Sequence, residues 1–453
     1  MDTRSLPVRP PYPQGPPSPL VCCTPNLLAT HYLALLLTCF YSEWHLPPNT
    51  INHATTGNVF MLGVGGLFVV WWSAYFGRLP VLLYFQCLSL GTAAWCSAAT
   101  SFKSFMAARI LNGFFSVVAA GGGLMFIKDM YFFHQHPRKI NIWSTALILS
   151  PFVGPLFAAL IVQSASWRWA FWLVTLIDAV ALILTVLFLD ETFYPRHTGA
   201  PVPQPKSRFL RLLGIEQRRT HLIPNTFFGA AKRSLVAISK LPVLIATVYY
   251  FFTFAWVIGN NITISVFIVP EYHFNYNQLA AIYVAPVLGA FIGQVGGHWL
   301  HDLIGHMYMR RHGGVIVPEA RLIIIWFVTP LYIIGMNLIG SSLTKHWHYM
   351  VLAVGWFLHN FSIIVLTTGL YAYCLDAYPE GSGEVAAWLN AARTWGGFVV
   401  GYVQINWALA EGEQKEYGIQ SAVVAVVFSM IVFLQFYGGK LRARQGPMNF
   451  KTQ

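Results

Sequence analysis

Apolar residues dominate the chain in long runs, and short polar breaks separate these runs. Several runs extend for about 20 residues with almost no charge, the length that a helix needs to cross roughly 30 Å of hydrocarbon. Lipid admits only helices and closed barrels, because every backbone polar group must be satisfied internally. We therefore predict an all-α membrane protein with helices at 27–41, 58–76, 80–100, 104–127, 141–163 and 167–189, and then at 241–269, 278–300, 321–342, 347–374, 383–408 and 417–437.

Longer polar stretches divide this pattern into regions. The Pro-rich start of the chain predicts a disordered cytoplasmic tail, and the basic break after the sixth helix predicts a cytoplasmic linker. Within that linker we expect a short interfacial helix at 225–240. The predicted regions are a tail at 1–25, a six-helix bundle at 26–189, the linker at 190–240, a second six-helix bundle at 241–437 and a tail at 438–453.

The first apolar run, LLATHYLALLLTCFY at 27–41, is shorter than the others. It has about 15 residues, fewer than a full crossing needs. A signal peptide is not expected, because a Pro-rich segment precedes the run and no A-x-A cleavage site follows it. We therefore expect a short or atypical first helix, or a first helix that is missing or altered in this sequence.

Composition and charge agree with a membrane protein. Of the 453 residues, 56% are hydrophobic and 10% are charged, whereas soluble domains carry about 25% charged residues. Most of the 28 Lys and Arg residues lie in the linker, the two tails and the breaks after the even-numbered helices. The other side of the predicted topology holds Lys103, Arg168, Lys345 and Lys415. The positive-inside rule then places both termini in the cytoplasm, so the net charge of +12 indicates topology and not nucleic-acid binding.

Ionisable side chains at membrane depth are costly and usually have a partner or a function. Arg109 lies inside the fourth predicted helix, with Asn112 about one turn away on a similar face. Asp178 lies near the centre of the sixth helix, where a buried carboxyl is suited either to exchanging a proton or to a hydrogen bond between helices. His359 is a candidate because a histidine in water titrates near neutral pH, although a lone His is more often a packing residue. These four residues are the candidates for proton coupling.

The second half adds polar side chains at membrane depth, which normally face the interior of a bundle. Interleaved aromatic residues suit a pocket for an amphipathic or cationic ligand, although many aromatics at this density face lipid or the core. The candidates for a substrate cavity are Asn260, Asn261, Gln294, Trp356, Asn360, Asn390 and Arg393.

The fifth predicted helix contains helix breakers, because ILSPFVGPLFAAL places Pro151, Gly154 and Pro155 within an apolar run. Proline removes a backbone donor and bends a helix, and small residues allow close helix packing in lipid. The end of the fourth helix (KDMYFF, with Asp129) has an echo at the end of the tenth (CLDAYP, with Asp376). Such weak internal repetition is typical of a two-half transporter.

Short motifs follow one another along the chain: GRLPVLL (77–83), RILNG (109–113), SPFVGPLFAA (150–159), WRWAFW (167–172), DETFYP (190–195), HGGVIVPEARL (312–322) and SGEVAAWLNAARTWGGF (382–398). Together and in this order they resemble the major facilitator superfamily, and within it the fungal proton-coupled drug and polyamine antiporters with twelve spans. The chain departs from the family pattern at Ala74 and Tyr75, where the family has an Asp and a basic residue. Ser150, Ala158 and Ala159 stand where the helix-5 motif has glycines.

The resemblance implies a major facilitator fold, with two six-helix bundles related by a pseudo-two-fold axis, in the plasma membrane. It implies that helix 5 packs on helix 8 near VLGAFIGQVGG (287–297), and that Arg109 belongs to the proton-coupling machinery. At the cytoplasmic rim we expect Arg78 to pair with Asp129, and Asp302 or Asp376 to pair with a basic residue such as Arg310, so that these pairs bias the two states. The candidate gate residues are Gly77, Arg78, Asp129, Ser150, Pro151, Gly154, Pro155, Asp302 and Asp376.

These features predict a secondary active transporter, not an enzyme, that exports small amphipathic or cationic organic compounds in exchange for protons. Proton-coupled uptake or facilitated transport of a small solute or polyamine is the alternative, and a non-transporting sensor is a remote one. A membrane di-iron enzyme would need more histidine clusters than GHWLHDLIGHMYMRRH supplies, and the sequence has no P-loop or HExxH motif. We expect no cofactor and no metal. The expected partners are the lipid bilayer, a small-molecule substrate and protons, with no nucleic acid and a monomeric chain.

Overall fold

The computed structural model describes residues 43–46, 48–118, 136–192, 207–215, 226–313 and 317–448, together with single positions between 119 and 135. Every regular element within these residues is helical, as the sequence predicts. The first predicted helix, 27–41, lies outside the described residues. Among the described helices, eight are long and apolar enough to cross a membrane.

The first set of long helices comes from the N-terminal part of the chain. Its members are α3 (Pro48–Phe76), α4 (Arg78–Ala98), α5 (Phe102–Ser116), α7 (His136–Ser164) and α8 (Arg168–Phe188). Each one overlaps a predicted helix. The predicted start of α3 at residue 58 is wrong, because a Pro begins the helix and a polar stretch, NTINHATTG, extends it before the apolar run.

The second set comes from the C-terminal part of the chain. Its members are α12 (Leu241–Tyr272), α13 (Tyr276–Arg311), α14 (Ile323–Thr344), α15 (Tyr349–Ala377), α16 (Ser382–Glu411) and α17 (Glu413–Gln445). The predicted end of α13 at residue 300 is too early. The helix continues to Arg311 through a polar segment that hydropathy alone assigns to a loop.

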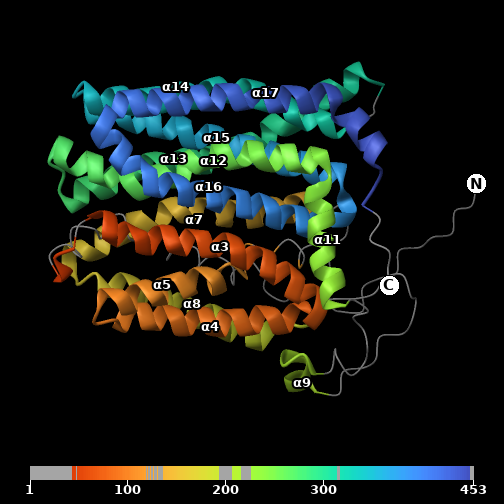
Figure 1. Cartoon of the computed structure of the whole chain (residues 1–453), viewed down its shortest axis with the longest axis horizontal. Coiled ribbons are helices and arrows are strands. Elements are labelled where there is room, and N and C mark those ends of the chain that lie inside the picture. Colours follow the sequence, from red (N-terminus) through yellow and green to blue (C-terminus); the bar gives the residue numbers. More distant parts are fainter. Residues whose placement is uncertain are drawn as a thin grey trace, which may run out of the picture.

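The two sets lie side by side with their helices aligned, and α11 (Phe227–Ser239) runs across the helix ends (Figure 1). We name this side of the molecule the α11 end and the other side the opposite end. α11 is the helix expected at 225–240, and its first turn is capped by the Thr226 hydroxyl, which accepts a hydrogen bond from the backbone of Gly229. The helix contacts α3 of the first set and both α12 and α16 of the second, so it joins the two sets.

Candidate functional site

Contacts between the two sets of helices form two seams. In one seam α7 packs against α13, and in the other α3 packs against α16. We call them the α7–α13 seam and the α3–α16 seam. The packing of helix 5 on helix 8, which the sequence resemblance implied, is present in the first of these seams.

Pro155 interrupts the hydrogen-bond ladder of α7. A proline has no N–H, so the carbonyl of Pro151, four residues earlier, lacks its helical donor. The side chain of Asn261 on α12 donates from Nδ2 to this carbonyl oxygen, at 3.3 Å. Both residues are buried, and a carbonyl buried without a donor costs about 1–3 kcal/mol. A side chain of the second set, Asn261, therefore supplies the hydrogen-bond donor that a backbone carbonyl of the first set lacks.

The breaker residues of α7 lie on its buried face. Ser150, Pro151, Gly154 and Pro155 are all buried, whereas Phe157 is 46% exposed on the same helix. This division fits a helix with one face at the seam and one face toward lipid. The role of these residues in gating stays a prediction.

The glycines of α13 make a different contact from the one expected. A Cβ added at Gly289 would lie 2.5 Å from the carbonyl oxygen of Phe357, and one added at Gly293 would lie 2.9 Å from that of Phe361. Both carbonyls belong to α15, inside the second set. The Gly-rich stretch 287–297 therefore allows α13 to approach α15 closely, while the same helix packs against α7.

The α3–α16 seam is also closely packed. The Asn52 side chain on α3 donates from Nδ2 to the carbonyl oxygen of Gly401 on α16, at 2.7 Å. A Cβ added at Gly66 of α3 would lie 2.9 Å from Nδ2 of Asn390 on α16. Glycine at residue 66 thus allows the amide of a predicted cavity residue to lie directly against the partner helix.

Asn390 is linked to the buried cation of the same helix. Arg393 donates from Nη2 to Oδ1 of Asn390 at 2.9 Å, and its guanidinium carbon lies 5.4 Å from the ring centroid of Phe254 on α12. A guanidinium over an aromatic face gains a cation–π attraction, which is stronger away from water. The structure therefore brings two predicted cavity residues together at the α3–α16 seam.

Two neighbouring amides of α12 have partners on different helices. Asn260 accepts a hydrogen bond at Oδ1 from Nε2 of Gln404 on α16, at 2.7 Å, whereas Asn261 binds the Pro151 carbonyl of α7. Consecutive helical residues point about 100° apart. This stretch of α12 thus contacts its own set on one side and the first set on the other.

Arg109 is fully buried in the first set. Its guanidinium carbon lies 5.4 Å from the ring centroid of Phe171 on α8, and its backbone carbonyl accepts a 2.6 Å hydrogen bond from Nδ2 of Asn58 on α3. A Cβ added at Gly113, one turn further along, would lie 2.2 Å from the Asn58 carbonyl oxygen. The Arg109 cation is therefore fixed between α3 and α8 by close packing.

Asn112 and Asp178 share one partner. The Ser89 hydroxyl on α4 donates to Oδ2 of Asp178 at 3.1 Å, and the Ser89 carbonyl accepts from Nδ2 of Asn112 at 3.2 Å. The three side chains come from α4, α5 and α8, and all are buried. Two of the predicted proton-coupling residues are thus joined inside the first set, and these contacts do not reach the seams.

The remaining predicted residues of the second half lie among α13, α14 and α15. The His359 ring lies 4.6 Å from the Tyr332 ring of α14, and Trp356 lies 4.9 Å from Tyr283 of α13, both between ring centroids. Asn360 donates to the carbonyl of Trp356 in its own helix at 2.8 Å. Gln294 is also buried, on α13. These contacts place His359 within the second set, away from the two seams.

At the α11 end of the first set, a carboxylate caps α4. Gly77 has a φ of 101°, which glycine adopts most easily, and this residue turns the chain sharply from α3 into α4. The backbone N–H groups of Arg78 and Leu79 then donate to Glu191 at 3.2 and 3.3 Å. A negative charge is favourable at a helix N-terminus. The expected partner of Arg78, Asp129, lies outside the described residues.

At the α11 end of the second set, two ion pairs join the helices. Asp376 accepts from Nε of Arg321 at 3.1 Å, so its partner is Arg321 and not the Arg310 suggested above. Glu319 forms a bidentate pair with Arg442 on α17, with distances of 2.8 and 2.9 Å, which the sequence analysis did not identify. Asp302 lies exposed on α13.

A polar group near the opposite end was also missed. Glu416 and Gln420 on α17 are fully buried, although Glu416 belongs to the polar break before the predicted helix 417–437 and Gln420 lies in the first turn of that helix. The signal was the spacing of four residues, which puts both side chains on one face of a helix. Burial of a carboxyl in this position is a property of the fold and not of composition.

Long apolar helices in two packed sets, with buried polar side chains at the seams, define a multi-pass integral membrane transporter. The chain belongs to the Major Facilitator Superfamily, whose family model matches residues 20–401. This membership confirms the predicted family and fold class, and it makes the chain a transporter rather than an enzyme.

Fungal transporters are among its relatives. The chain is 26% identical over 411 residues to "Efflux pump radE" of Floropilus chiversii, a match that covers 85% of this chain and 73% of that protein. It is 24% identical over 451 residues to "Probable drug/proton antiporter YHK8" of Saccharomyces cerevisiae, covering 91% and 83%.

Solved structures of the same superfamily share the fold. The human organic anion transporter MFSD10 superposes with a TM-score of 0.65 at 18% identity, covering 91% of this chain and 97% of that chain. The xylose transporter XylE from E. coli, in a partially occluded inward-open conformation, gives a TM-score of 0.61 at 14% identity, covering 92% and 96%.

Proposed function

We propose that this chain exports small amphipathic or cationic organic compounds in exchange for protons. In the proposed cycle the two sets of helices rock at the α7–α13 and α3–α16 seams and expose a shared pocket to each side in turn. The observation that carries the proposal is the hydrogen bond from Asn261 to the Pro151 carbonyl. One bond of this kind, across the seam and at a proline, can be broken and remade at a cost of about 1–3 kcal/mol.

The direction of transport is inferred from the relatives and from α7. The relatives named above include one described as an efflux pump and one described as a drug/proton antiporter. The breaker residues of α7, which resemble the antiporter motif, are buried, and the Pro151 carbonyl accepts a hydrogen bond from the second set. Both observations favour export over uptake.

The substrate pocket is assigned to the polar residues at the seams. Asn390 and Arg393 lie where α16 meets α3, and Asn260 and Asn261 lie where α12 meets α16 and α7. These groups offer amide donors and acceptors and one cation, with no acid among them. Such a lining suits neutral or weakly cationic amphipathic compounds better than polycations.

Proton coupling is assigned to the first set. Arg109 is a fixed buried cation, and Asp178 is a buried carboxyl with hydroxyl and amide neighbours. A proton that binds such a carboxyl changes the charge at membrane depth, and the membrane potential then contributes about 2.3 kcal/mol per charge per 100 mV. The pH gradient and the potential together would supply the driving force for export.

We also propose that the α11 end faces the cytoplasm of a plasma membrane. This end carries Arg211, Lys232, Arg233, Lys240, Arg310, Arg311 and Arg442, whereas Lys103, Arg168, Lys345 and Lys415 lie toward the opposite end. A cytoplasmic excess of Lys and Arg is the rule for helical membrane proteins.

Flux in proteoliposomes tests this function. Purified protein would be reconstituted and assayed with fluorescent organic cations and neutral amphiphiles, with and without an imposed pH gradient. The proposal expects accumulation of at least one compound against its concentration gradient when the proton gradient has the opposite direction. Movement of substrate in the same direction as protons would identify a symporter, and flux that ignores the proton gradient would exclude coupling.

A further inference from the structure

A buried polar cluster lies near the opposite end of the second set, away from the groups assigned above to proton coupling. Glu416 on α17, Gln420 on α17 and Gln404 on α16 are each 0% exposed. Gln404 also donates to Asn260 on α12, at 2.7 Å. We call these four residues the Glu416 cluster. They join three helices of the second set.

The hydrogen bonds of the cluster leave oxygens without donors. Gln420 donates from Nε2 to Oε1 of Glu416 at 2.7 Å, and the Gln404 side chain lies within hydrogen-bonding reach of the same carboxyl. Among the described residues, no hydrogen-bond donor reaches Oε2 of Glu416, Oε1 of Gln404 or Oε1 of Gln420. Nδ2 of Asn260 is the unpartnered donor in the cluster, so three acceptors face one free donor, and a buried acceptor without a donor is costly.

The charges around Glu416 do not neutralise it. Within the described residues no Lys, Arg or His forms an ion pair with this carboxyl, and Glu413 on the same helix lies close enough to repel a negative charge on it. Tyr417 is the neighbouring phenol on α17. At the same end, Lys415 is paired with Glu411 of α16 at 3.5 Å, and His346 after α14 is paired with Glu271 of α12. A carboxyl buried without a cation is more stable when neutral.

We propose that Glu416 is a proton-binding site in the second set of helices, separate from Arg109 and Asp178. A proton from water forms an O–H bond at Oε2, and the resulting carboxylic acid donates a hydrogen bond to a neighbouring amide oxygen, such as that of Gln404. Protonation therefore removes the buried charge and supplies the donor that the cluster lacks. Loss of the proton to water restores the carboxylate.

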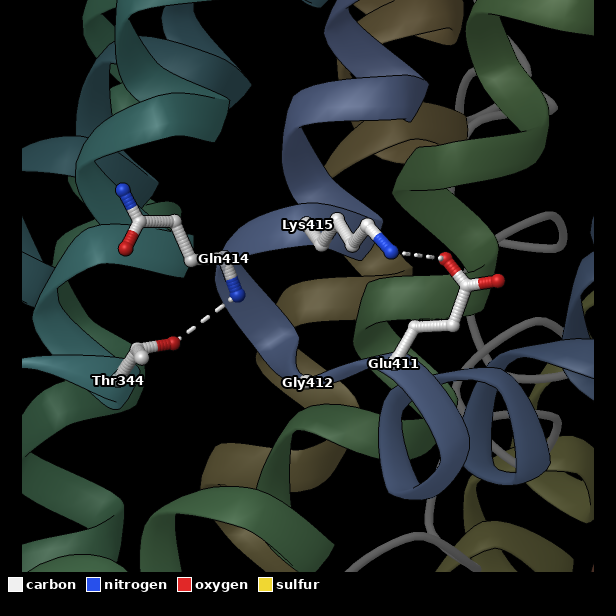
Figure 2. A pocket seen from close by; sticks show the side chains of 5 residues that line it. All are labelled: Thr344, Glu411, Gly412, Gln414 and Lys415. Atoms are coloured by element: carbon white, nitrogen blue, oxygen red, sulfur yellow. Dashed lines mark hydrogen bonds and ion pairs between the residues drawn. The ribbon is translucent and has the colours of Figure 1, made fainter.

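A surface hollow is formed in part by residues adjacent to Glu416 in the chain. A hollow of about 320 Å³ at the turn between α16 and α17 is lined by Thr344, Glu411, Gly412, Gln414 and Lys415, and Figure 2 shows these five residues. The Gln414 backbone N–H donates to the Thr344 hydroxyl at 3.0 Å, and the Lys415 side chain extends toward Glu411. Glu416 is the next residue after Lys415 in the chain, and its side chain is buried. Protons would reach it from the opposite end of the molecule.

The cluster also lies next to the seam. Gln404 binds Asn260, and Asn261, the following residue of α12, binds the Pro151 carbonyl of α7. When Glu416 gains or loses its proton, the Gln404 amide gains or loses a hydrogen-bond partner. The strength of the hydrogen bond between Gln404 of α16 and Asn260 of α12 then changes. This coupling of Glu416 to the seam rests on the proposed function, whereas proton binding at Glu416 does not.

Infrared difference spectroscopy of the full chain in lipid nanodiscs, titrated with pH, tests the site directly. Protonated carboxyls absorb at higher frequency than carboxylates, and the proposal expects Glu416→Gln to remove one titrating carboxyl band from the wild-type difference spectrum. Glu411→Gln, which neutralises an exposed acid of α16, should leave that band in place. Glu416→Asp keeps a carboxyl and should retain a titrating band at a shifted frequency. This variant tests the site even if Glu416→Gln folds poorly.

The outcomes separate this site from transport itself. A difference spectrum that Glu416→Gln leaves unchanged would overturn the proposal, even in a protein that transports. Loss of the carboxyl band on adding Na⁺ at constant pH would assign the cluster to a metal cation and would also overturn it. A band that is lost only in Glu416→Gln supports the site, even if flux assays show no proton coupling.

Discussion

The side chain of Asn261 donates a hydrogen bond to the carbonyl of Pro151, the carbonyl that Pro155 leaves without its helical partner. The two residues are 110 positions apart and belong to different sets of helices. The bond explains how α7 contains two prolines at membrane depth without an unsatisfied carbonyl at this point. Because the donor belongs to the second set, this hydrogen bond of α7 depends on where the second set lies relative to the first.

Asn261→Ala should therefore impair transport. Removal of the amide leaves the buried Pro151 carbonyl without its donor, at a cost of about 1–3 kcal/mol, which corresponds to a roughly five- to 150-fold change if it falls on a single barrier. The measurement is the initial flux rate in proteoliposomes. Asn337→Ala on α14 is the control, because its amide binds a carbonyl of its own helix and the residue is not a candidate site residue. Equal flux in wild type and Asn261→Ala would contradict the role of this bond.

Gly154→Leu should abolish transport while the protein remains in the membrane. Gly154 is buried on α7 beside Pro155, where a larger side chain would prevent close helix packing. Gly91→Leu on α4 is the control, because a Cβ at residue 91 meets no atom within 4 Å. Membrane abundance and flux would be measured for both variants. A functional Gly154→Leu protein would show that close packing at this position is not required.

Gly289→Ala should destabilise the second set of helices. The added Cβ would lie 2.5 Å from the Phe357 carbonyl oxygen of α15, and such overpacking typically costs about 1–3 kcal/mol. The change is measured as a lower thermal unfolding temperature of the purified protein. Gly296→Ala should leave that temperature unchanged, because no atom lies within 4 Å of its added Cβ. Equal unfolding temperatures in the two variants would contradict the assigned contact between α13 and α15.

Arg109→Gln should remove proton-driven flux without loss of the folded protein. The change deletes the buried cation beside Phe171 and keeps a shorter, neutral polar side chain. Lys103→Gln removes an exposed cation from the first turn of the same helix and should transport normally. The readout is substrate accumulation under an imposed pH gradient. If Arg109→Gln still accumulates substrate in response to the gradient, the assignment of this residue is wrong.

Glu384→Gln should loosen α11 from the bundle. Glu384 of α16 pairs with Nε of Arg233 on α11 at 3.1 Å, and a second contact, from Nε1 of Trp388 to the Ser234 carbonyl at 2.9 Å, holds the same turn. Hydrogen exchange of residues 227–239 should be faster in the variant. Glu411→Gln, at the other end of α16, should leave this exchange unchanged. Identical protection of α11 in all three proteins would show that the ion pair does not hold the helix.

The helices follow from the sequence because lipid tolerates few alternatives. Apolar runs therefore predict the cores of the long helices, and the family motifs predict how those helices are paired. The first and last residues of the helices were less predictable. Polar residues extend α3 back to Pro48 and α13 on to Arg311, since a helix can continue beyond the hydrocarbon with no hydropathic signal.

The candidate site was predictable as a set of residue types and not as a set of contacts. Depth and polarity identify Arg109, Asp178 and Asn261 as buried groups that need partners. Their partners depend on helix rotation, which a single sequence does not determine. The same limit explains the glycines of α13, whose spacing predicts close packing but not that α15 is the neighbour. Glu416 was missed because its polar neighbours hide its burial.

Distances between spin labels across the two sets test the central claim most directly. In a chain whose six cysteines are replaced, one label pair would be placed at the opposite end, on Ser166 and Lys345, and another at the α11 end, on Phe76 and Arg311. Pulsed electron resonance would then be recorded across pH and with a transported compound. Rocking at the seams predicts that one distance lengthens while the other shortens. Distances that stay constant, or that change in the same direction at both ends, would contradict the account.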